Sequence, residues 1–265
     1  GKESEYTPYY TELAEQAKLR GVAVSVISLI GSECCLENLS IVTDQTGGIV
    51  TRVDPLQLEN ELATINNQPI LGYTTVAMII LHRGLRFQNE MEDEKENRNW
   101  IVKDLGNVRA DTELSFQYTF RSKAECDLSN INEIPFQVQL MYTKPNGEQS
   151  LRIACAKISV TDDRTEAEKN ANLNVIGTHA AQRAAKFAQK GNYDRAQMET
   201  RSAQRFMQRN GVQTEKISEW SQQVKHVDSV VREEKKKGKR NEIHCDASVT
   251  AFSKQRQMKS FFSTN

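Results

Sequence analysis

The chain has 265 residues, and its 35 Lys and Arg residues balance 35 Asp and Glu residues, so the formal net charge is zero. This balance argues against a dominant role in binding nucleic acid or an anionic membrane, because no net basic charge attracts the chain to either. No apolar run approaches the roughly 18 to 20 residues of a membrane-spanning helix, and the five cysteines form no CxxC pair or Cys/His cluster at zinc spacing. We therefore expect a cytoplasmic protein with reduced thiols and no membrane span.

The first 55 residues alternate between helix and strand patterns. Residues 10–19 have the apolar spacing of a helix, and residues 21–30 (GVAVSVISLI) form a nearly continuous apolar run. Such a run predicts a strand buried on both faces, as in a parallel sheet covered by helices. Residues 36–46 predict a second helix, and the Gly-Gly pair after it predicts a turn into a strand at 49–53. Two strands are too few for a complete doubly wound sheet, so this segment predicts the end of an α/β domain.

An antiparallel β-sandwich is predicted next. A strand at 74–81 is followed by strands at 114–120, 136–142 and 151–158, in which apolar and polar residues alternate. Alternation predicts a sheet with one buried face, and two such sheets make a sandwich. The Pro-Asn-Gly sequence at 145–147 predicts a hairpin turn between the last two strands. The side chains expected in the sandwich core are Phe116, Tyr118, Phe136, Val138 and Leu140.

The sequence becomes helical after residue 160. Asp163 and its neighbours are suited to cap a helix that runs to about residue 188, and further helices are predicted at 193–209 and 214–236. A basic run follows, which is a candidate partner-binding site for an acidic protein surface, RNA or acidic lipid. Its members are Lys235, Lys236, Lys237, Lys239 and Arg240. The alternative interpretation is a solvated helix end, where cations also suit the helix dipole.

These patterns predict a multi-part α+β fold. It comprises the end of an A-type α/β domain at 1–65, an antiparallel β-sandwich at 66–162, a helical hairpin or bundle at 163–237 and a polar tail at 238–265.

Three features resemble known families. Residues 21–30 and 44–55 (DQTGGIVTRVDP) resemble the closing part of a von Willebrand factor A-type domain. Residues 134–163 (IPFQVQLMYTKPNGEQSLRIACAKISVTDD) resemble the strand pair that closes the β-sandwich of the COPII vesicle-coat trunk proteins. The order of trunk, sandwich and helical region is that of the same coat family. The chain is also similar to circularly permuted Ras-like proteins of protists, and these resemblances imply a part of a larger assembly.

The chain departs from these families at the sites that carry chemistry. It has no counterpart of the coat family's zinc ribbon or gelsolin-like module. It lacks the Asp-x-Ser-x-Ser loop of the A-type metal site, so Asp44 and Asp54 are not assigned as metal ligands. It also contains no GxxxxGK[ST], GxSxG or HExxH motif. We therefore predict no catalytic residue, cofactor or metal site, and we expect that the chain is not an enzyme.

The function predicted from these observations is a non-catalytic protein-interaction or scaffold module. Its partners would be proteins in a larger complex, such as a vesicle coat or a cytoskeletal assembly, and no small-molecule substrate is expected. Two alternatives stay open, a COPII-like coat component and the regulatory part of a GTPase-like switch protein. Fold resemblance alone does not decide among them.

Overall fold

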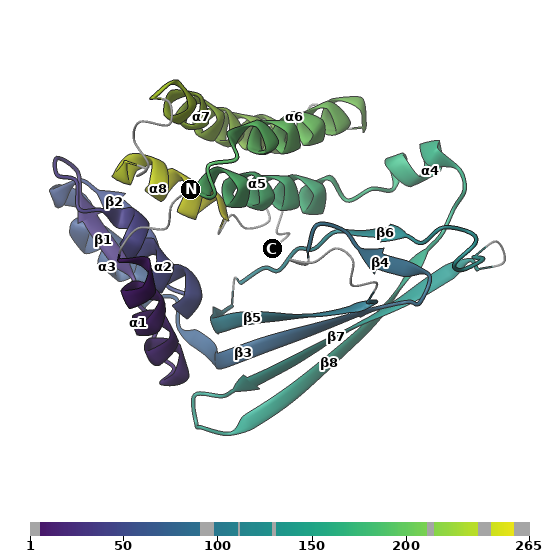
Figure 1. Cartoon of the computed structure of the whole chain (residues 1–265), viewed down its shortest axis with the longest axis horizontal. Helices are drawn as coiled ribbons and strands as arrows, with labels where there is room; N and C mark the ends of the chain where they lie inside the picture. The colour runs from purple at the N-terminus through teal and green to yellow at the C-terminus, as the bar shows by residue number, and fades with distance from the viewer. Residues whose placement is uncertain are drawn as a thin grey trace. The chain divides into compact units, whose positions relative to one another are not determined.

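The computed structural model describes residues 6–90, 98–110, 112–128, 131–210, 215–237 and 245–256 (Figure 1). The chain separates into two compact units, each discontinuous in sequence. We call the first the helical unit, and it contains residues 1–69, 109–113 and 172–265. The second, the sandwich unit, contains residues 70–108 and 114–171. The predicted α/β segment and the C-terminal helices therefore share one unit.

The N-terminal part of the helical unit has the predicted α/β order. Strands β1 and β2 pair in parallel, with Val26 opposite Val50 and Leu29 opposite Val53. The elements are α1 (Thr7–Leu19), β1 (Val26–Leu29), α2 (Leu36–Thr46), β2 (Val50–Val53), the 3-10 helix η1 (Pro55–Gln57) and α3 (Leu58–Asn66).

The predicted Gly-Gly turn is present, and the structure explains both glycines. Gly47 ends α2 with a φ of 74°, in the left-handed region that favours glycine. A Cβ atom on Gly48 would lie 1.7 Å from the carbonyl oxygen of Val24. Only a residue without a side chain allows this close approach of the turn to the segment that leads into β1.

The expectation that residues 21–30 are buried on both faces is wrong for this chain. Only Ser28 is buried, whereas Val22, Leu29 and Ile30 are 49%, 41% and 59% exposed. One physical reason is that the strand is shorter than predicted, since β1 comprises only Val26–Leu29 and the exposed Val22 and Ile30 lie outside it. The apolar composition of residues 21–30 is that of a central strand, but the described part of this unit does not bury the segment on both faces.

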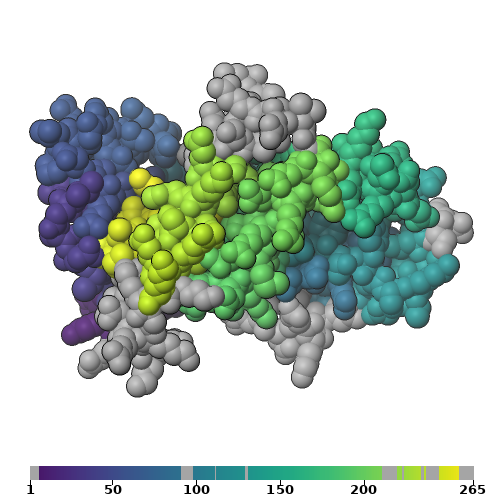
Figure 2. All heavy atoms as spheres, turned by 90° about the horizontal axis from the view of Figure 1, so that it is seen from above, coloured from purple at the N-terminus to yellow at the C-terminus, as the bar shows by residue number. Residues whose placement is uncertain are grey.

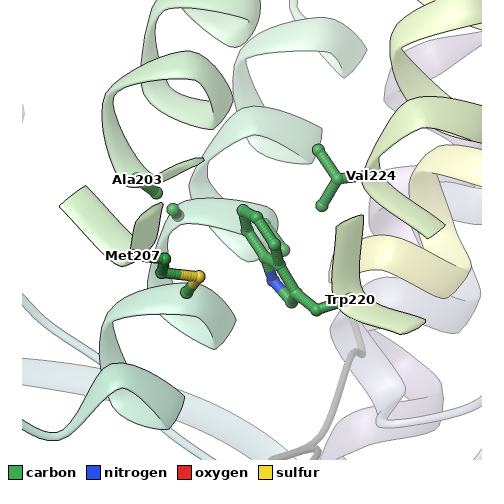
Figure 3. Packing of buried hydrophobic residues seen from close by; sticks show 6 residues of the cluster. Ala203, Met207, Trp220 and Val224 are labelled. Atoms are coloured by element: carbon green, nitrogen blue, oxygen red, sulfur yellow. The ribbon is translucent and has the colours of Figure 1, made fainter. Parts of the chain in front are cut away.

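Four helices of the described residues complete the helical unit, and three of them pack around Trp220. Trp220 fills the space between α5, α6 and α7, where it contacts Ala203, Met207 and Val224 (Figure 3). These helices are α5 (Leu173–Gln189), α6 (Tyr193–Asn210), α7 (Glu215–Lys237) and α8 (Asp246–Arg256).

The first predicted long helix is two helices. The short α4 (Arg164–Lys169) belongs to the sandwich unit, and Asp163 caps it as predicted by accepting hydrogen bonds from the N–H groups of Thr165 and Glu166. The chain then leaves the helical conformation, and Asn172 caps α5 through the N–H groups of Asn174 and Val175. A second side-chain cap of this kind competes with a continuous helix.

The segment predicted as a polar tail contains α8, which is largely buried. Phe252 is fully buried against Ala184, Ala188 and Val231, and Val249 packs with Leu36 and Val50. Helix α8 therefore joins the other helices to the α/β part inside this unit, as the yellow helix in Figure 1 shows.

The sandwich unit is built on a four-stranded sheet with the order β5-β3-β7-β8, and a two-stranded sheet of β4 and β6 accompanies it. The predicted hairpin is confirmed, because Gly147 has a φ of 86° and Lys144 donates its N–H to the Glu148 carbonyl at 2.8 Å. The strands are β3 (Ile70–Leu81), β4 (Leu85–Phe87), β5 (Trp100–Arg109), β6 (Tyr118–Phe120), β7 (Glu133–Thr143) and β8 (Gln149–Ser159).

The predicted sandwich core is confirmed in part. Val138 and Leu140 pack on Ala77, Ile79 and Ile101, and Phe116 and Phe136 pack on a second cluster with Leu81, Leu85 and Ile134. Each of the four is half-buried rather than fully buried. The placement of Tyr118 in the core is wrong, since this side chain is 37% exposed. It lies on β6, a three-residue strand that pairs only with β4 in the described residues.

Candidate functional site

Helix α8 is attached to the α/β part by the carboxylate of its first residue. Asp246 is 1% exposed, and it accepts hydrogen bonds from the backbone N–H of Leu36 at 2.8 Å and from that of Cys34. Leu36 is the first residue of α2, whose N-terminal N–H groups have no partner within the helix. Asp246 therefore caps α2 from a position far along the sequence, and its charge also suits the positive end of the helix dipole.

The surroundings of Asp246 reinforce this attachment. The side chain of Glu33 accepts the backbone N–H of Asp246 at 2.8 Å and forms an ion pair with Arg52 at 3.2 Å. Burial of the Asp246 carboxyl opposes ionisation, but the N–H groups of Cys34 and Leu36 outweigh it and lower the pKa of Asp246 below its ordinary value. The ionised carboxylate is thus the form that holds α8.

The other end of α8 is held by an ion pair between Arg256 and Asp44 of α2. Burial raises the pKa of Asp44 from its ordinary 3.8 to about 6, while Arg256 and a hydrogen bond from Gln189 act in the opposite direction. Asp44 is not assigned as a metal ligand from the sequence, and its partner in the structure is an arginine.

The pKa of Asp44 predicts a pH dependence of stability. Between pH 3.8 and about 6 the folded chain keeps the proton that the unfolded chain has lost, so the free energy of unfolding should fall as the pH rises through this window. A difference of roughly two pKa units corresponds to about 3 kcal/mol at most. In urea titrations at pH 4.5 and 7, Asp44→Asn should remove this part of the slope. An unchanged slope would contradict the prediction.

A groove of about 800 Å³ lies between α7 and α8, at the carboxyl ends of β1 and β2. In Figure 2, yellow α8 lies between the purple-to-blue α/β segment and yellow-green α7. The α/β part contributes Ile30 and Arg52. The helices contribute Gln222, Val224, His226 and Val227 from α7, and Ala247, Thr250, Ala251, Lys254 and Gln255 from α8.

The basic run that was predicted to bind a partner is only partly described. Helix α7 ends at Lys237, and Lys236 is exposed near this end. Lys239 and Arg240 lie outside the described residues, as do the side chains of Lys235 and Lys237. No described residue of the run is among those that line the groove. The run therefore stays a prediction.

The sandwich unit presents a second candidate surface along β8. This strand forms the end of the four-stranded sheet, and ten of its eleven residues are exposed. Register places Leu151 and Ile153 opposite Met141 and Gln139 on the face that points away from the Val138 and Leu140 core. Leu151, Ile153 and Met141 are more than half exposed. An apolar face thus continues to a sheet edge that no strand of the described residues covers.

A small apolar slot opens beside the same edge. It has a volume of about 80 Å³ and lies between the two sheets of the sandwich unit, next to Ile158 of β8. Tyr118 and Phe120 of β6 line it on the other side, and both are partly exposed. Partial burial raises the pKa of the Tyr118 hydroxyl above its ordinary value.

Asp54 and the cysteines have no chemical role that the described residues indicate. The Asp54 carboxylate accepts the N–H of Leu56 and begins η1, which is a structural role. None of the five cysteines forms a disulfide within the described part of the chain. No group of three or more His, Cys, Asp or Glu side chains in the described ranges is arranged to hold a metal ion. None of the helices in those ranges combines the length and apolarity needed to cross a membrane.

The comparisons with known proteins support the predicted resemblance. No family model matches the chain. It is 27% identical over 199 residues to "Circularly permutated Ras protein 1" of Dictyostelium discoideum, a match that covers 75% of this chain and 23% of that protein. The human COPII-coat protein Sec24c has a similar structure, with a TM-score of 0.64 at 15% identity, over 98% of this chain and 35% of that one.

These matches confirm the predicted α+β fold class, its likeness to the coat protein and a distant homology to the permuted Ras protein. The chain spans about a quarter of the curated relative's length and about a third of the matched structure's length.

Proposed function

We propose that the chain is a non-catalytic interaction module of a larger cytoplasmic assembly, and that β8 is an edge at which a partner strand pairs. The observation that carries the proposal is the exposure of β8, whose eleven residues end the sheet and expose Leu151 and Ile153. An edge strand offers a row of unpaired N–H and C=O groups, and peptide partners use such edges by adding a strand.

The side chains of β8 do little to guard this edge. Natural proteins protect edge strands with proline, bulges, charges or short length. Strand β8 is long and contains no proline, and its regular pairing with β7 continues from Gln149 to Ser159. Its two charges are Arg152 and Lys157, and the latter is paired with Glu133 of β7 at 3.2 Å. We infer that pairing with another segment covers this edge in the assembly.

The likeness to a coat protein supports an assembly role. The similar structure is that of a COPII-coat protein, and coats are built from interacting subunits. A COPII-like coat component is therefore the finer form of this proposal. The sequence contributes the other support, since it carries none of the phosphate-loop, nucleophile-elbow or zinc-protease motifs.

The proposal is tested by site-specific crosslinking in cells. A photoreactive phenylalanine analogue placed at Leu151 or Ile153 should crosslink the same partner protein, because both side chains share one face of the edge strand. Ile153→Lys should weaken capture of that partner by at least about tenfold, because an edge lysine opposes strand addition.

Met198 provides the matched control, since it is 68% exposed on α6 in the other unit. The analogue at Met198 should not capture the same partner, and Met198→Lys should leave capture at position 151 unchanged. Equal crosslinking from positions 153 and 198, or no crosslink from β8 at all, would overturn the proposal.

A second candidate is the regulatory part of a Ras-type switch protein. The 27% identity to the permuted Ras protein over 199 residues favours it. The two candidate functions predict different motifs in the whole gene product. A switch protein requires a GxxxxGK[ST] loop to hold the nucleotide phosphates, and these 265 residues contain none. A phosphate loop elsewhere in the same gene product would favour the switch, and its absence would favour the coat component.

A further inference from the structure

One face of α8 borders the groove between α7 and α8. Ala247, Thr250, Ala251 and Lys254 line it at spacings i, i+3, i+4 and i+7, so one continuous face of α8 borders the groove. Val224 and Val227 of α7 form apolar parts of the facing wall. From Ala247 to Lys254 this face extends for about 10 Å, or two helical turns.

The side chains on this face suit a helix as the occupant. Alanine and threonine are small. Because the distance between packed helices depends on the side chains at their contact, a second helix could approach α8 closely on this face. Ala251 is half-buried and Ala247 is exposed, so this face of α8 is not fully covered by the rest of the unit. An amphipathic helix in a groove places apolar residues at i, i+3 or i+4, and i+7, which is the spacing that α8 presents here.

The charged side chains that line the groove are basic, which favours an acidic occupant. Arg52 and Lys254 line it, and no aspartate or glutamate is among the described residues that do so. Arg52 is already paired with Glu33, but Lys254 is exposed and forms no ion pair with the described part of the chain. Gln255 adds an amide that is 5% exposed and has no hydrogen-bond partner among the described residues at either polar atom. An acidic residue on the occupant would complement Lys254.

We propose that this groove binds an acidic amphipathic helix of a protein partner, with its apolar face on Ala247, Ala251 and Val227 and a carboxylate beside Lys254. The site lies in the helical unit, whereas the proposed docking edge β8 lies in the sandwich unit. The groove proposal therefore goes beyond the proposed function. A negative result at one surface does not contradict the proposal for the other.

The test uses the whole chain and two synthetic probes of known sequence. The first is a fluorescent helical peptide of about four turns, with leucine on one face and glutamate on the other. The second has the same leucine face and lysine in place of glutamate. In anisotropy titrations the chain should bind the Leu/Glu peptide at least about tenfold more tightly than the Leu/Lys peptide.

Two substitutions locate the binding. Ala251→Trp fills the groove and should weaken Leu/Glu binding at least about tenfold, and Lys254→Glu should reverse the preference between the two peptides. Lys236→Glu is the matched control, because Lys236 is an exposed lysine of the basic run outside the groove. It should change binding by less than about twofold.

Circular dichroism of each variant establishes that the chain is folded, and Lys254→Glu changes an exposed side chain only. The proposal is overturned when the Leu/Glu peptide does not bind, when Ala251→Trp and Lys254→Glu both leave its affinity unchanged, or when Lys236→Glu weakens it as much as Lys254→Glu does.

Discussion

Replacing Phe252 with alanine should lower the free energy of unfolding of the helical unit by about 3 to 5 kcal/mol. The ring is fully buried, and it packs on Ala184, Ala188 and Val231 from two other helices. The neighbouring alanine side chains are too short to fill the space that the ring leaves, so the cavity should persist. Because α8 also supplies Val249 to the α/β core, loosening it should weaken both parts of this unit.

The two tryptophans of the chain allow this unit to be measured by itself. Trp220 lies in the helical unit and is 2% exposed, whereas Trp100 lies in the sandwich unit. In a Trp100→Phe background, urea unfolding followed by fluorescence reports the helical unit. Leu56→Ala is the control, because Leu56 is 88% exposed and should change stability by less than about 0.5 kcal/mol. A Phe252→Ala midpoint equal to that of the control would show that α8 does not contribute to the core.

Local signals predicted most elements of the fold. Strands β7 and β8 follow from apolar alternation and from a Pro-Asn-Gly turn, because both depend on residues that are near in sequence. The turn from α2 into β2 follows from Gly47 and Gly48 for the same reason. Helices α5, α6 and α7 were also predicted, since apolar stripes at helical spacing are visible without knowledge of the partner helix, but the break between α4 and α5 was not.

What the sequence did not reveal depends on residues that are distant in sequence. Helix α8 has only a few apolar residues, and its attachment depends on bonds from Asp246 to Cys34 and Leu36. The groove requires α7, α8 and the ends of β1 and β2 together. The exposure of β1 could not be predicted either, because an apolar run shows that a strand suits burial but not which segment covers it. The candidate interaction surfaces were therefore found in the structure.

Replacing Asp246 with alanine should destabilise the helical unit by about 2 to 4 kcal/mol. The substitution removes the acceptor of the buried Leu36 N–H, and such a group without a partner costs about 1 to 3 kcal/mol. It also removes the acceptor of the part-buried Cys34 N–H, which water can partly replace. In addition, it removes a negative charge from the positive end of the α2 dipole, which contributes about 0.3 to 1 kcal/mol. Trp220 fluorescence in urea, in the Trp100→Phe background, measures the loss.

Two further measurements distinguish this cap from a general effect of the mutation. Asp246→Asn keeps one acceptor oxygen but not the charge, so its loss should be smaller than that of Asp246→Ala. The pKa of Asp246 is lowered in the folded chain, so its contribution is complete above its ordinary value of 3.8 and is lost as the pH falls through the lower folded value. The parent and Asp246→Ala should therefore differ most at neutral pH and converge in acid. A difference that is the same at pH 7 and pH 2.5 would mean that the Asp246 carboxylate charge is not what holds α8 to α2.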